Sequence, residues 1–490
     1  MGERLLVIDE GTSSTRAMLF DLEGRCLGLA QHPVRSDFPE PGWVEQDPEE
    51  IWQLTRAAAG AMVRKAGGAD RVAAIGITNQ RETMVFWDRR TGRPLGPAIV
   101  WQDRRTGPFC EELKQQGREP AVQSTTGLLL DPYFSASKIR WALDHWPQLK
   151  EAGADLAVGT IDSWLVFRLT GGLHVSDATN ASRTALMGLV GGWDEGMLDL
   201  FAVPRFALPE VCDSAGPIGA TLADHFGAAI PICGMAGDQQ AAAIGQACFA
   251  AGGTKATFGT GTFVLTHAGD SPPVSRSRLL GTVAWQLDGV RRYALEGSLF
   301  VAGSMMQWLR DQLGLIGTSA ESEALARSVP DSAGVTVVPA FTGLGAPHWD
   351  ADARGAILGL TLGANRAHIV RAALEAVANQ TFELQRAFAA DGVHWSVLRI
   401  DGGMSANAFL AQDLADLLGL DVERPANIET SALGAAMLAG VGAGLFKSLE
   451  DAADAVRGPG EQFVPGPDKG ARATRIAAWD RAVAAVRTAR

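Results

Sequence analysis

Short apolar runs that end in polar residues recur along the chain, and this pattern predicts buried strands. Residues 5–8 (Leu-Leu-Val-Ile) form the first run, which ends at Asp9 and is followed by turn residues at 11–14. Two further runs, 16–21 and 25–30, are separated by Leu-Glu-Gly. The chain is therefore expected to open as an antiparallel meander.

The rest of the chain alternates between helical and strand-like patterns. The segment 47–65 has helical spacing, with Asp47 as the N-cap and Pro48 at the first helical position. Further helices are predicted at 135–145, 162–169, 238–249, 368–389, 407–418, 431–439 and 471–487, the last as a solvated capping helix. Further strands are predicted at 72–78, 83–87, 98–101, 157–160, 231–235, 255–259, 263–266, 335–339 and 398–401. Those at 83–87 and 98–101 are expected to continue the first sheet.

The opening pattern recurs near the middle of the chain. After the break Ala-Ala-Gly-Gly at 250–253, a strand, a Gly-Thr-Gly-Thr turn at 259–262 and a return strand follow one another. This echo indicates two related α/β halves, residues 1–250 and 251–490, although chance similarity would also explain it.

Composition and charge narrow the class of protein. The 490 residues suit two or three domains, and the formal charge of −12 argues against nucleic acid or an anionic membrane as the main partner. Five widely spaced cysteines without a Cys-x-x-Cys motif argue against disulfides or zinc and fit a reducing cytosol. The first strand leaves no room for a signal peptide, and the segment 431–446 is too short and Gly-rich for a membrane span. We expect a cytoplasmic protein.

The turn after the first strand is the first candidate for chemistry. Asp9 ends a buried strand and could hold Mg²⁺ through water, while the hydroxyls of Thr12, Ser13 and Ser14 and the charge of Arg16 could hold phosphate. An ordinary Gly/Ser hairpin is the alternative. The turn 259–262, with Thr260, favours the phosphate reading, because two such turns could face each other across a cleft.

The second candidate follows the strand 72–78. Arg81 and Glu82 could donate to and accept from substrate hydroxyls, or they could form a surface salt-bridging turn. Trp101 could cover the carbon skeleton of a small polar substrate, although a tryptophan there is more often core.

Two more strand ends carry polar groups. Asp238 follows a strand and a glycine turn, where a carboxylate could accept a proton from an attacking hydroxyl or cap a helix. The segment 401–407 (Asp-Gly-Gly-Met-Ser-Ala-Asn) would let a flat ligand lie against its glycines, with Asn407 as ligand or cap. The sequence has no Gly-x4-Gly-Lys-[Ser/Thr] motif, and Gly-x-Gly at 259–261 precedes a strand, so P-loop and dinucleotide fingerprints are excluded.

At this point the motifs resemble a known family. From residue 5 to about residue 479 the chain resembles the glycerol kinases of the FGGY carbohydrate-kinase family, which has the actin-like, ribonuclease H-like ATPase fold with an interdomain cleft. The most specific matching stretches are ITNQRET (77–83), IVWQ (99–102), DPYFS (131–135), TNASRT (179–184), AGDQQAA (236–242) and PAFTGLGAP (339–347). The Arg-Glu pair and the Asp-Pro-Tyr-Phe-Ser run are what point to glycerol.

The resemblance implies ATP-dependent phosphorylation of glycerol to sn-glycerol 3-phosphate, the first step of glycerol catabolism. It implies that Asp238 is the general base and that ATP and Mg²⁺ are required, with Asp9 and Asp238 as indirect Mg²⁺ partners. The N-terminal half would bind glycerol and phosphate, and the C-terminal half the nucleotide. The implied glycerol-binding residues are Arg81, Glu82, Trp101, Tyr133, Asp238, Gln239 and Phe263. The implied ATP-binding residues are Thr12, Ser13, Ser14, Arg16, Thr260, Gly303, Gln307, Gly403 and Asn407.

Departures from the family pattern bear on regulation. Ser13 stands where many members have Thr, which preserves the hydroxyl. The Gly-Gly-Thr-Arg segment associated with fructose-1,6-bisphosphate inhibition reads Phe-Gly-Ala-Ala at 226–229, so we expect no such inhibition. His225 lies near a regulatory phosphohistidine of other members, but its surroundings match poorly, and an ordinary surface histidine is expected. Members form dimers and tetramers, so a homo-oligomer is expected. A pentulose or other polyol kinase, and an actin-like module without kinase chemistry, remain the alternatives.

Overall fold

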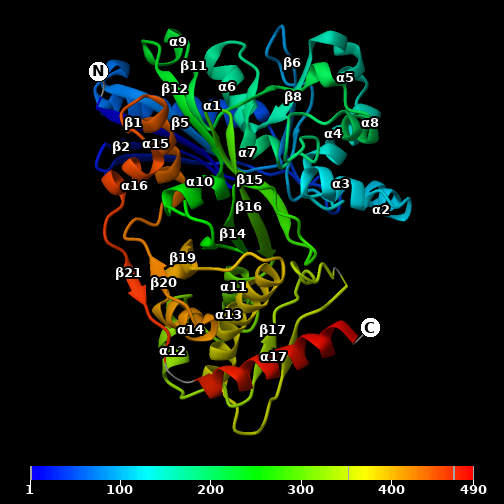
Figure 1. The fold of residues 1–490 in the computed structure, drawn as a ribbon, viewed down its shortest axis with the longest axis vertical. Helices are drawn as coiled ribbons and strands as arrows, with labels where there is room; N and C mark the ends of the chain where they lie inside the picture. The colour runs from blue at the N-terminus through cyan, green and yellow to red at the C-terminus, as the bar shows by residue number, and fades with distance from the viewer. Residues whose placement is uncertain (1–2, 351, 467–468, 489–490) are drawn as a thin grey trace.

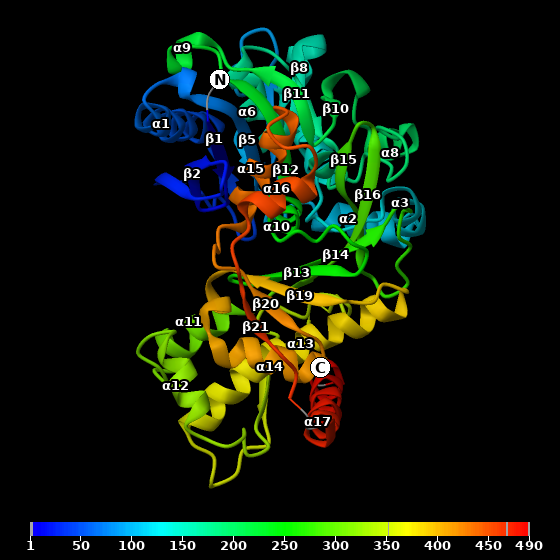
Figure 2. The same cartoon turned by 60° about the vertical axis from the view of Figure 1, so that its left-hand side comes forward.

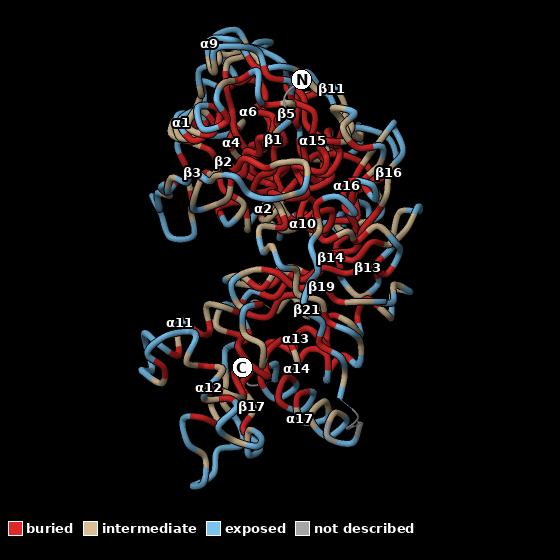
Figure 3. The backbone as a smooth tube through the Cα atoms, turned by 90° about the vertical axis from the view of Figure 1, so that its left-hand side faces the viewer, coloured by how far each residue is buried: buried red, intermediate tan, exposed pale blue. Residues whose placement is uncertain are grey.

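The chain forms two α/β lobes, one above the other in Figure 1. The computed structural model describes residues 3–350, 352–466 and 469–488. The N-terminal half makes up most of the upper lobe, and most of the C-terminal half makes up the lower one. Buried backbone, red in Figure 3, runs through the interior of both lobes.

The upper lobe is built on a sheet with the order β11-β12-β5-β1-β2-β3. Its strands are β1 (Arg4–Glu10), β2 (Ser14–Asp21), β3 (Cys26–Pro33), β5 (Val72–Asn79), β11 (Ala215–Ala220) and β12 (Pro231–Gly237). The pairs β1–β2 and β2–β3 are antiparallel, which confirms the predicted meander, whereas β1–β5 and β5–β12 are parallel. Alternate residues of β1 belong to two different hydrophobic clusters. Leu6 and Ile8 pack on one face of the sheet, and Leu5 and Val7 pack on the other. A strand covered on both faces is apolar throughout, as this one is.

A second sheet beside the first corrects the prediction for residues 83–87 and 98–101. These residues do not continue the first sheet, because β6 (Met84–Asp88) and β7 (Ala98–Ile99) pair with β4 (Glu45–Gln46) and β8 (Leu156–Thr160) in the order β4-β7-β6-β8. The turn at residues 80–83 redirects the chain, and apolar runs alone do not tell to which sheet a strand belongs. The small pair β9 (Val175–Asp177) and β10 (Glu210–Cys212) completes this half.

The helices of the N-terminal half surround these sheets. They are α1 (Pro48–Ala66), α2 (Gly107–Gln115), α3 (Glu119–Thr126), α4 (Ser135–His145), α5 (Pro147–Ala152), α6 (Ile161–Thr170), α7 (Ala178–Ala181), α8 (Glu195–Phe201), α9 (Ala223–Phe226) and α10 (Asp238–Gly245). The α1 helix begins as predicted, since the Asp47 side chain accepts a hydrogen bond from the main-chain N–H of Glu49. The α10 helix ends at Gly245 rather than at the predicted residue 249.

The C-terminal half carries a sheet with the order β15-β16-β14-β13-β19-β20-β21. Its strands are β13 (Gly253–Phe258), β14 (Thr262–Gly269), β15 (Leu280–Leu287), β16 (Val290–Leu299), β19 (Val397–Asp401), β20 (Val422–Arg424) and β21 (Glu461–Phe463), and β17 (Thr336–Val338) pairs separately with β18 (Ala356–Leu358). The β15–β16 hairpin was not predicted, and β15 contacts α7 of the upper lobe. The remaining helices are α11 (Gly303–Asp311), α12 (Glu321–Arg327), α13 (Arg366–Ala390), α14 (Ala408–Leu418), α15 (Thr430–Gly442), α16 (Leu449–Val456) and α17 (Lys469–Thr488).

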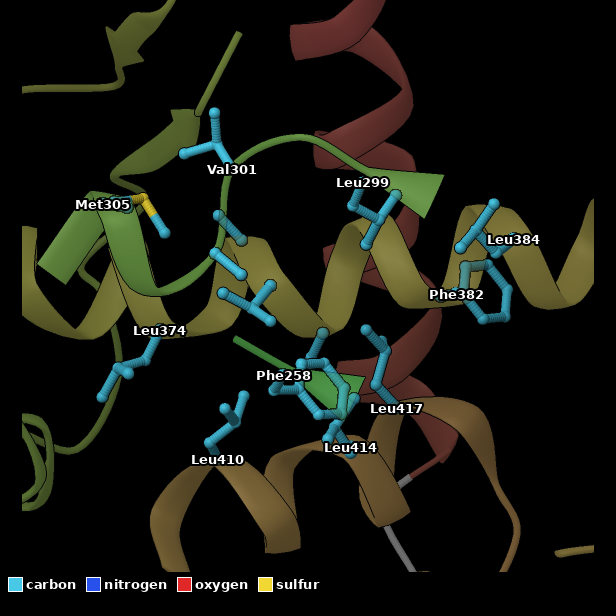
Figure 4. Packing of buried hydrophobic residues seen from close by; sticks show 14 of the residues in the cluster. Phe258, Leu299, Val301, Met305, Leu374, Phe382, Leu384, Leu410, Leu414 and Leu417 are labelled. Carbon is cyan, nitrogen blue, oxygen red and sulfur yellow. The ribbon is translucent and has the colours of Figure 1, made fainter. Parts of the chain in front are cut away.

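The core of the lower lobe lies between this sheet and its helices. Figure 4 shows Phe258 of β13 and Leu299 of β16 beside side chains of α13 and α14, including Leu374 and Leu414. The α17 helix was predicted to be only a solvated cap, but Trp479 is buried in the same cluster. Its widely spaced apolar residues form one buried stripe, which its many alanines and arginines obscure in the sequence.

The α15 helix returns to the upper lobe, although it belongs to the C-terminal half. Figures 1 and 2 show α15 and α16, both orange, against the N-terminal strands. A Cβ added at Gly434 of α15 would lie 1.8 Å from the main-chain oxygen of Ala241 in α10, and one added at Gly76 of β5 would lie 2.2 Å from that of Ala435. Such separations exclude any side chain, so the helix lies directly on α10 and on the sheet. Within the described residues, no helix is long and apolar enough to cross a membrane.

Candidate active site

The parallel strands β1, β5 and β12 end at one edge of the upper sheet. Asp9 pairs in register with Thr78, and Gly237 with Asn79, so the residues that follow these strands leave the sheet together. Polar groups beyond the carboxyl ends of such strands form ligand sites in α/β folds. The edge therefore brings together the residues around Asp9, Arg81 and Asp238.

Arg81 is the centre of this group of side chains. Its Nε lies 3.4 Å from Oδ1 of Asp238 and 3.9 Å from Oε1 of Glu82, and its Nη2 donates to the Tyr133 hydroxyl at 3.4 Å. The side chains of Arg81 and Glu82 are almost fully buried, whereas that of Asp238 is 33% exposed. The Asp238 carboxylate is thus held beside a buried cation and remains open to a ligand.

Aromatic side chains stand beside these polar groups. The Trp101 ring lies 5.6 Å from that of Tyr133 and 6.2 Å from that of Phe263, centroid to centroid, with edge-on geometry in both pairs. Trp101 comes from the N-terminal half and Phe263 from β14 of the C-terminal half. The predicted apolar walls are therefore adjacent, and they join the two halves of the chain.

A ring of alternating charges supports Arg81 and Glu82. Glu296 of β16 accepts from Arg81 at 2.6 Å and from Arg183 at 2.8 Å, and Arg183 also donates to Glu82 at 2.6 Å. The two guanidiniums lower the pKa of Glu296 to about 2, against the opposing effect of burial. Glu82 has a positive φ of 62°, a conformation rare for non-glycine residues. These ion pairs hold its strained backbone and the Arg81 guanidinium in place.

A buried lysine holds the main chain at Tyr133. The Lys138 ammonium donates to the main-chain oxygens of Pro132, Tyr133 and Phe134 at 2.6, 2.6 and 3.2 Å. Burial lowers the pKa of Lys138 to about 8, against the effect of nearby acidic side chains such as Glu82. Lys138 thereby fixes the turn that presents the Tyr133 hydroxyl to Arg81.

The predicted phosphate hairpin lies next to the aromatic wall. The Trp101 indole N–H donates to the Thr12 hydroxyl at 2.9 Å, and Gln31 donates to Ser14 at 3.0 Å. Ser13 is exposed. Arg16 forms ion pairs with Asp9 and with Glu429, which lies just before α15. The hairpin therefore contacts Trp101 of the aromatic group directly.

The predicted nucleotide residues form another group, on the lower lobe. The main-chain N–H of Gly303 donates to Gly259 at 2.9 Å, and Ser304 donates to the main-chain oxygen of Thr260 at 3.0 Å. A Cβ on Gly303 would lie 3.8 Å from Met404, which follows Gly403. The turn 259–262, the start of α11 and the 3-10 turn Gly403–Ala406 are thus adjacent.

The other two predicted nucleotide residues lie on or at the start of helices of the same lobe. Gln307 is exposed on α11. Asn407 caps α14 by accepting from the main-chain N–H of Leu410 at 3.0 Å, and it donates to Ser322 of α12 at 3.3 Å. The capping role considered for Asn407 is confirmed.

The acidic groups suit a hydrated divalent cation rather than a protein cage. Burial and the neighbouring Asp238 carboxylate raise the pKa of Asp9, whereas Arg16 lowers it. A cation between these two carboxylates would relieve their repulsion. Among the described residues no group of three or more His, Cys, Asp or Glu could hold a metal ion. Mg²⁺ commonly uses one or two carboxylates with waters and phosphates, and Asp9 and Asp238 fit that mode.

Four charged residues of the site were missed in the sequence-based assignment of ligands. They are Lys138, Arg183, Glu296 and Lys255, whose ammonium donates to Oε1 of Gln239. Arg183 lies in a stretch that matches the family, and Lys255 is the charged residue of a strand that otherwise has apolar or hydroxyl-bearing side chains. Neither observation shows from the sequence which side chain these residues contact.

A cavity of about 400 Å³ is lined by residues of β20, α16 and β21 and contains none of the predicted site residues.

Comparisons with known proteins identify the family. The model of the N-terminal domain of the FGGY family of carbohydrate kinases matches residues 4–245, and that of the C-terminal domain matches residues 254–443. A relative from Gluconobacter oxydans named glycerol kinase is 53% identical over 485 residues, which cover 98% of this chain and 94% of the relative. The chain belongs to the FGGY family of carbohydrate kinases.

Solved structures agree in fold. A Plasmodium falciparum glycerol kinase with ADP superposes with a TM-score of 0.94 at 35% identity, covering 99% of each chain. A xylulose kinase from Rhodospirillum rubrum superposes with a TM-score of 0.87 at 27% identity, covering 98% of each chain. The two-domain α/β fold and the family resemblance found in the sequence are both confirmed.

Proposed function

We propose that the protein transfers the γ-phosphoryl group of ATP to a terminal hydroxyl of glycerol and forms sn-glycerol 3-phosphate and ADP. The observation that carries this proposal is the convergence of Arg81, Glu82, Tyr133 and Asp238 at one edge of the upper sheet. The similarity of the chain to the glycerol kinase of Gluconobacter oxydans over nearly the full length supports glycerol as the substrate.

The group can bind a small triol through both donors and acceptors. The Arg81 guanidinium supplies donors, the Glu82 carboxylate supplies acceptors, and Tyr133 and Gln239 supply both kinds. Trp101 and Phe263 would cover the carbon skeleton. A site that pairs every hydroxyl strongly rejects analogues that lack one, because a buried partner is then left unpaired.

Asp238 has the position of a general base. Its carboxylate would accept the proton of the attacking hydroxyl as the oxygen forms its bond to the γ-phosphorus and the bond to the β–γ bridging oxygen breaks, which releases ADP. The Asp238 side chain is partly exposed beside Arg81, which supports its contact with that hydroxyl. Asp238 would then carry the proton to solvent after the product leaves.

The two groups of phosphate and nucleotide residues would hold ATP between them. Thr12, Ser13, Ser14 and Arg16 would contact phosphate oxygens from the upper lobe, and Thr260 from the turn of the lower lobe. Gly303, Gln307, Gly403 and Asn407 would line the nucleoside side. When bound near Asp9 and Asp238, Mg²⁺ would neutralise charge on the phosphates.

In this proposal residues 1–250 supply most of the glycerol and phosphate site, and residues 251–490 supply the nucleotide site. Closure of the lobes on both substrates would exclude water and so limit ATP hydrolysis. All five cysteines are free, which supports a cytoplasmic location. We also propose that the protein is a homo-oligomer, as members of the family that it resembles are.

The decisive experiment is a coupled assay of the purified protein with ATP, Mg²⁺ and a panel of glycerol, xylulose and gluconate. We expect the highest kcat/KM for glycerol and little ATP turnover without a polyol. Higher efficiency with xylulose or gluconate would favour another carbohydrate kinase, in line with the fold shared with xylulose kinase. ATP turnover independent of any polyol would instead indicate a nucleotide-binding module without kinase chemistry.

A further inference from the structure

Lys255 lies at the junction of the two halves with no exposed surface. It belongs to β13, and its ammonium donates to Oε1 of Gln239, to the Thr257 hydroxyl at 2.9 Å and to the main-chain oxygen of Phe263 at 3.3 Å. An ammonium has three donors and no acceptor, so these three contacts use all of its hydrogens. Two of its partners, Gln239 and Phe263, belong to the proposed glycerol site.

Nearby carboxylates stabilise the charged form of the buried Lys255. Burial lowers the pKa of Lys255, whereas Asp401, Asp238 and Glu296 raise it. The same lysine in turn lowers the pKa of Glu296, the carboxylate that holds Arg81. Lys255 is therefore the charged link between the C-terminal sheet and the start of α10.

The contact with Gln239 decides how that side chain meets a ligand. An amide could present either its oxygen or its NH₂ group, and an ammonium can only face the oxygen. With its oxygen held by Lys255, Gln239 has its NH₂ group left to donate to a substrate hydroxyl. The main-chain N–H of Gln239 donates to Oδ1 of Asp238 at 2.7 Å, so its backbone also contacts the proposed base.

The contact between Lys255 and Phe263 positions part of the apolar wall. The Phe263 carbonyl is held by Lys255, and its ring faces Trp101. Lys255 thus fixes both Gln239, which can hydrogen-bond to the substrate, and Phe263 of the apolar wall, and it lies outside the site itself. No part of its side chain is exposed, so it acts through these neighbours rather than on the substrate itself.

We propose that Lys255 is a positioning residue for the polyol substrate, which orients the Gln239 amide as a donor and fixes Phe263 against Trp101. This inference rests on the proposed function, because it assumes that the group around Asp238 binds glycerol. It adds a determinant of polyol affinity that lies in the C-terminal half of the chain.

The test replaces Lys255 by Met, which keeps most of the stem and removes the ammonium. For K255M we expect a KM for glycerol about 10- to 100-fold higher, the effect of losing a hydrogen bond to a charged group, with the KM for ATP within about threefold of wild type. The control is T254V on the same strand, whose hydroxyl contacts Gly252 and Thr266 instead, and both constants should stay near wild type. A structural defect alone would raise both constants or lower the folded fraction.

Double-mutant analysis identifies the route of the effect. If Lys255 acts through Gln239, the glycerol KM of K255M/Q239L will rise by less than the product of the two single effects. Fully multiplicative effects, or an unchanged glycerol KM in K255M, would overturn the inference. If K255M does not fold, K255Q keeps a donor towards Gln239, and an equal rise in both KM values for that variant would also overturn it.

The outcome for the wild-type protein separates this inference from the proposed function. A wild type that phosphorylates glycerol while K255M retains its glycerol KM refutes only the role of Lys255. A wild type that prefers another polyol refutes the glycerol assignment, and the same comparison of KM values made with that polyol then decides the role of Lys255.

Discussion

Oδ1 of Asp238 lies 3.4 Å from Nε of Arg81, and that arginine is itself held by Glu296 at 2.6 Å. The acid at the start of α10 is therefore placed by a side chain from β16, far away in the sequence. The guanidinium contacts the carboxylate, whose side chain remains 33% exposed. This relationship underlies the predictions for the replacement of Asp238 and of Arg81.

Replacement of Asp238 by Asn removes the proton acceptor and nearly preserves its shape. We expect kcat with glycerol to fall by about 10²- to 10⁴-fold, the usual contribution of a general base, while ATP still binds. A coupled assay and a nucleotide-binding titration measure the two effects. The control D224N, at an exposed position on α9, should keep wild-type turnover, and a D238N variant with more than half of the wild-type kcat would refute the assignment.

Loss of the Tyr133 hydroxyl should weaken glycerol binding selectively. In Y133F the contact at 3.4 Å with Arg81 disappears, so we expect the KM for glycerol to rise about tenfold, equivalent to about 1.4 kcal/mol, with little change in the KM for ATP. Steady-state kinetics with each substrate varied in turn measure both constants. Equal increases in the two constants would count against Tyr133 as part of the glycerol site.

Removal of Arg81 should have a larger and less specific effect. R81A should raise the KM for glycerol more than that for ATP, and it also leaves Glu296 with one cation fewer. Breaking such a buried pair costs about 3–5 kcal/mol. Thermal unfolding should therefore show a lower Tm for R81A than for Y133F, and equal Tm values would contradict the charge ring.

Stability should depend on pH through Glu10. Burial raises its pKa from 4.5 to about 8, while hydrogen bonds from Thr15 and Thr55 oppose the shift. Between these values the unfolded chain releases the proton and the folded chain retains it, so the stabilising contribution of Glu10 is greatest below pH 4.5 and falls as the pH rises to about 8. The contribution is up to about 1.4 kcal/mol per pH unit.

The variant E10Q cannot ionise and should lose this contribution to the pH dependence. Urea unfolding between pH 5.5 and 8.5 should show E10Q gaining stability relative to wild type as the pH rises, whereas E40Q, at an exposed position, should follow wild type. A constant difference between E10Q and wild type across this range would mean that Glu10 is already ionised in the folded protein.

Fructose-1,6-bisphosphate should not inhibit through the loop after α9. Gly227, Ala228 and Ala229 are exposed and offer no arginine to a sugar phosphate. Glycerol phosphorylation in the presence of fructose-1,6-bisphosphate should therefore match the rate without it. Clear inhibition at saturating ATP and glycerol would show that another part of the chain binds the effector.

Local patterns were sufficient for most helices and strands. The apolar run before Asp9 and the N-cap at Asp47 are short-range signals, and both gave the correct element. Sheet membership depends on long-range pairing, so β6 was assigned to the wrong sheet. Arg81, Glu82 and Asp238 lie together as predicted because they follow the adjacent parallel strands β5 and β12, whereas their role in binding substrate stays a prediction.

The supporting charges could not be predicted in the same way. Glu296 contacts Arg81, which is 215 positions away, and Arg183 contacts Glu82, 101 positions away. Nothing in the local sequence of β16 distinguishes a carboxylate that holds a substrate ligand from one at the surface. Only the folded arrangement of the two halves shows that these residues serve the site.

The placement of α15 affects how the protein is made. Its buried residues cover strands that leave the ribosome early, yet the helix itself emerges only near the end of translation. Until then an apolar face of the first lobe is uncovered, which favours binding by chaperones or aggregation. A nascent chain or fragment that stops at residue 250 would not complete its own first lobe, however well its ligand residues were preserved.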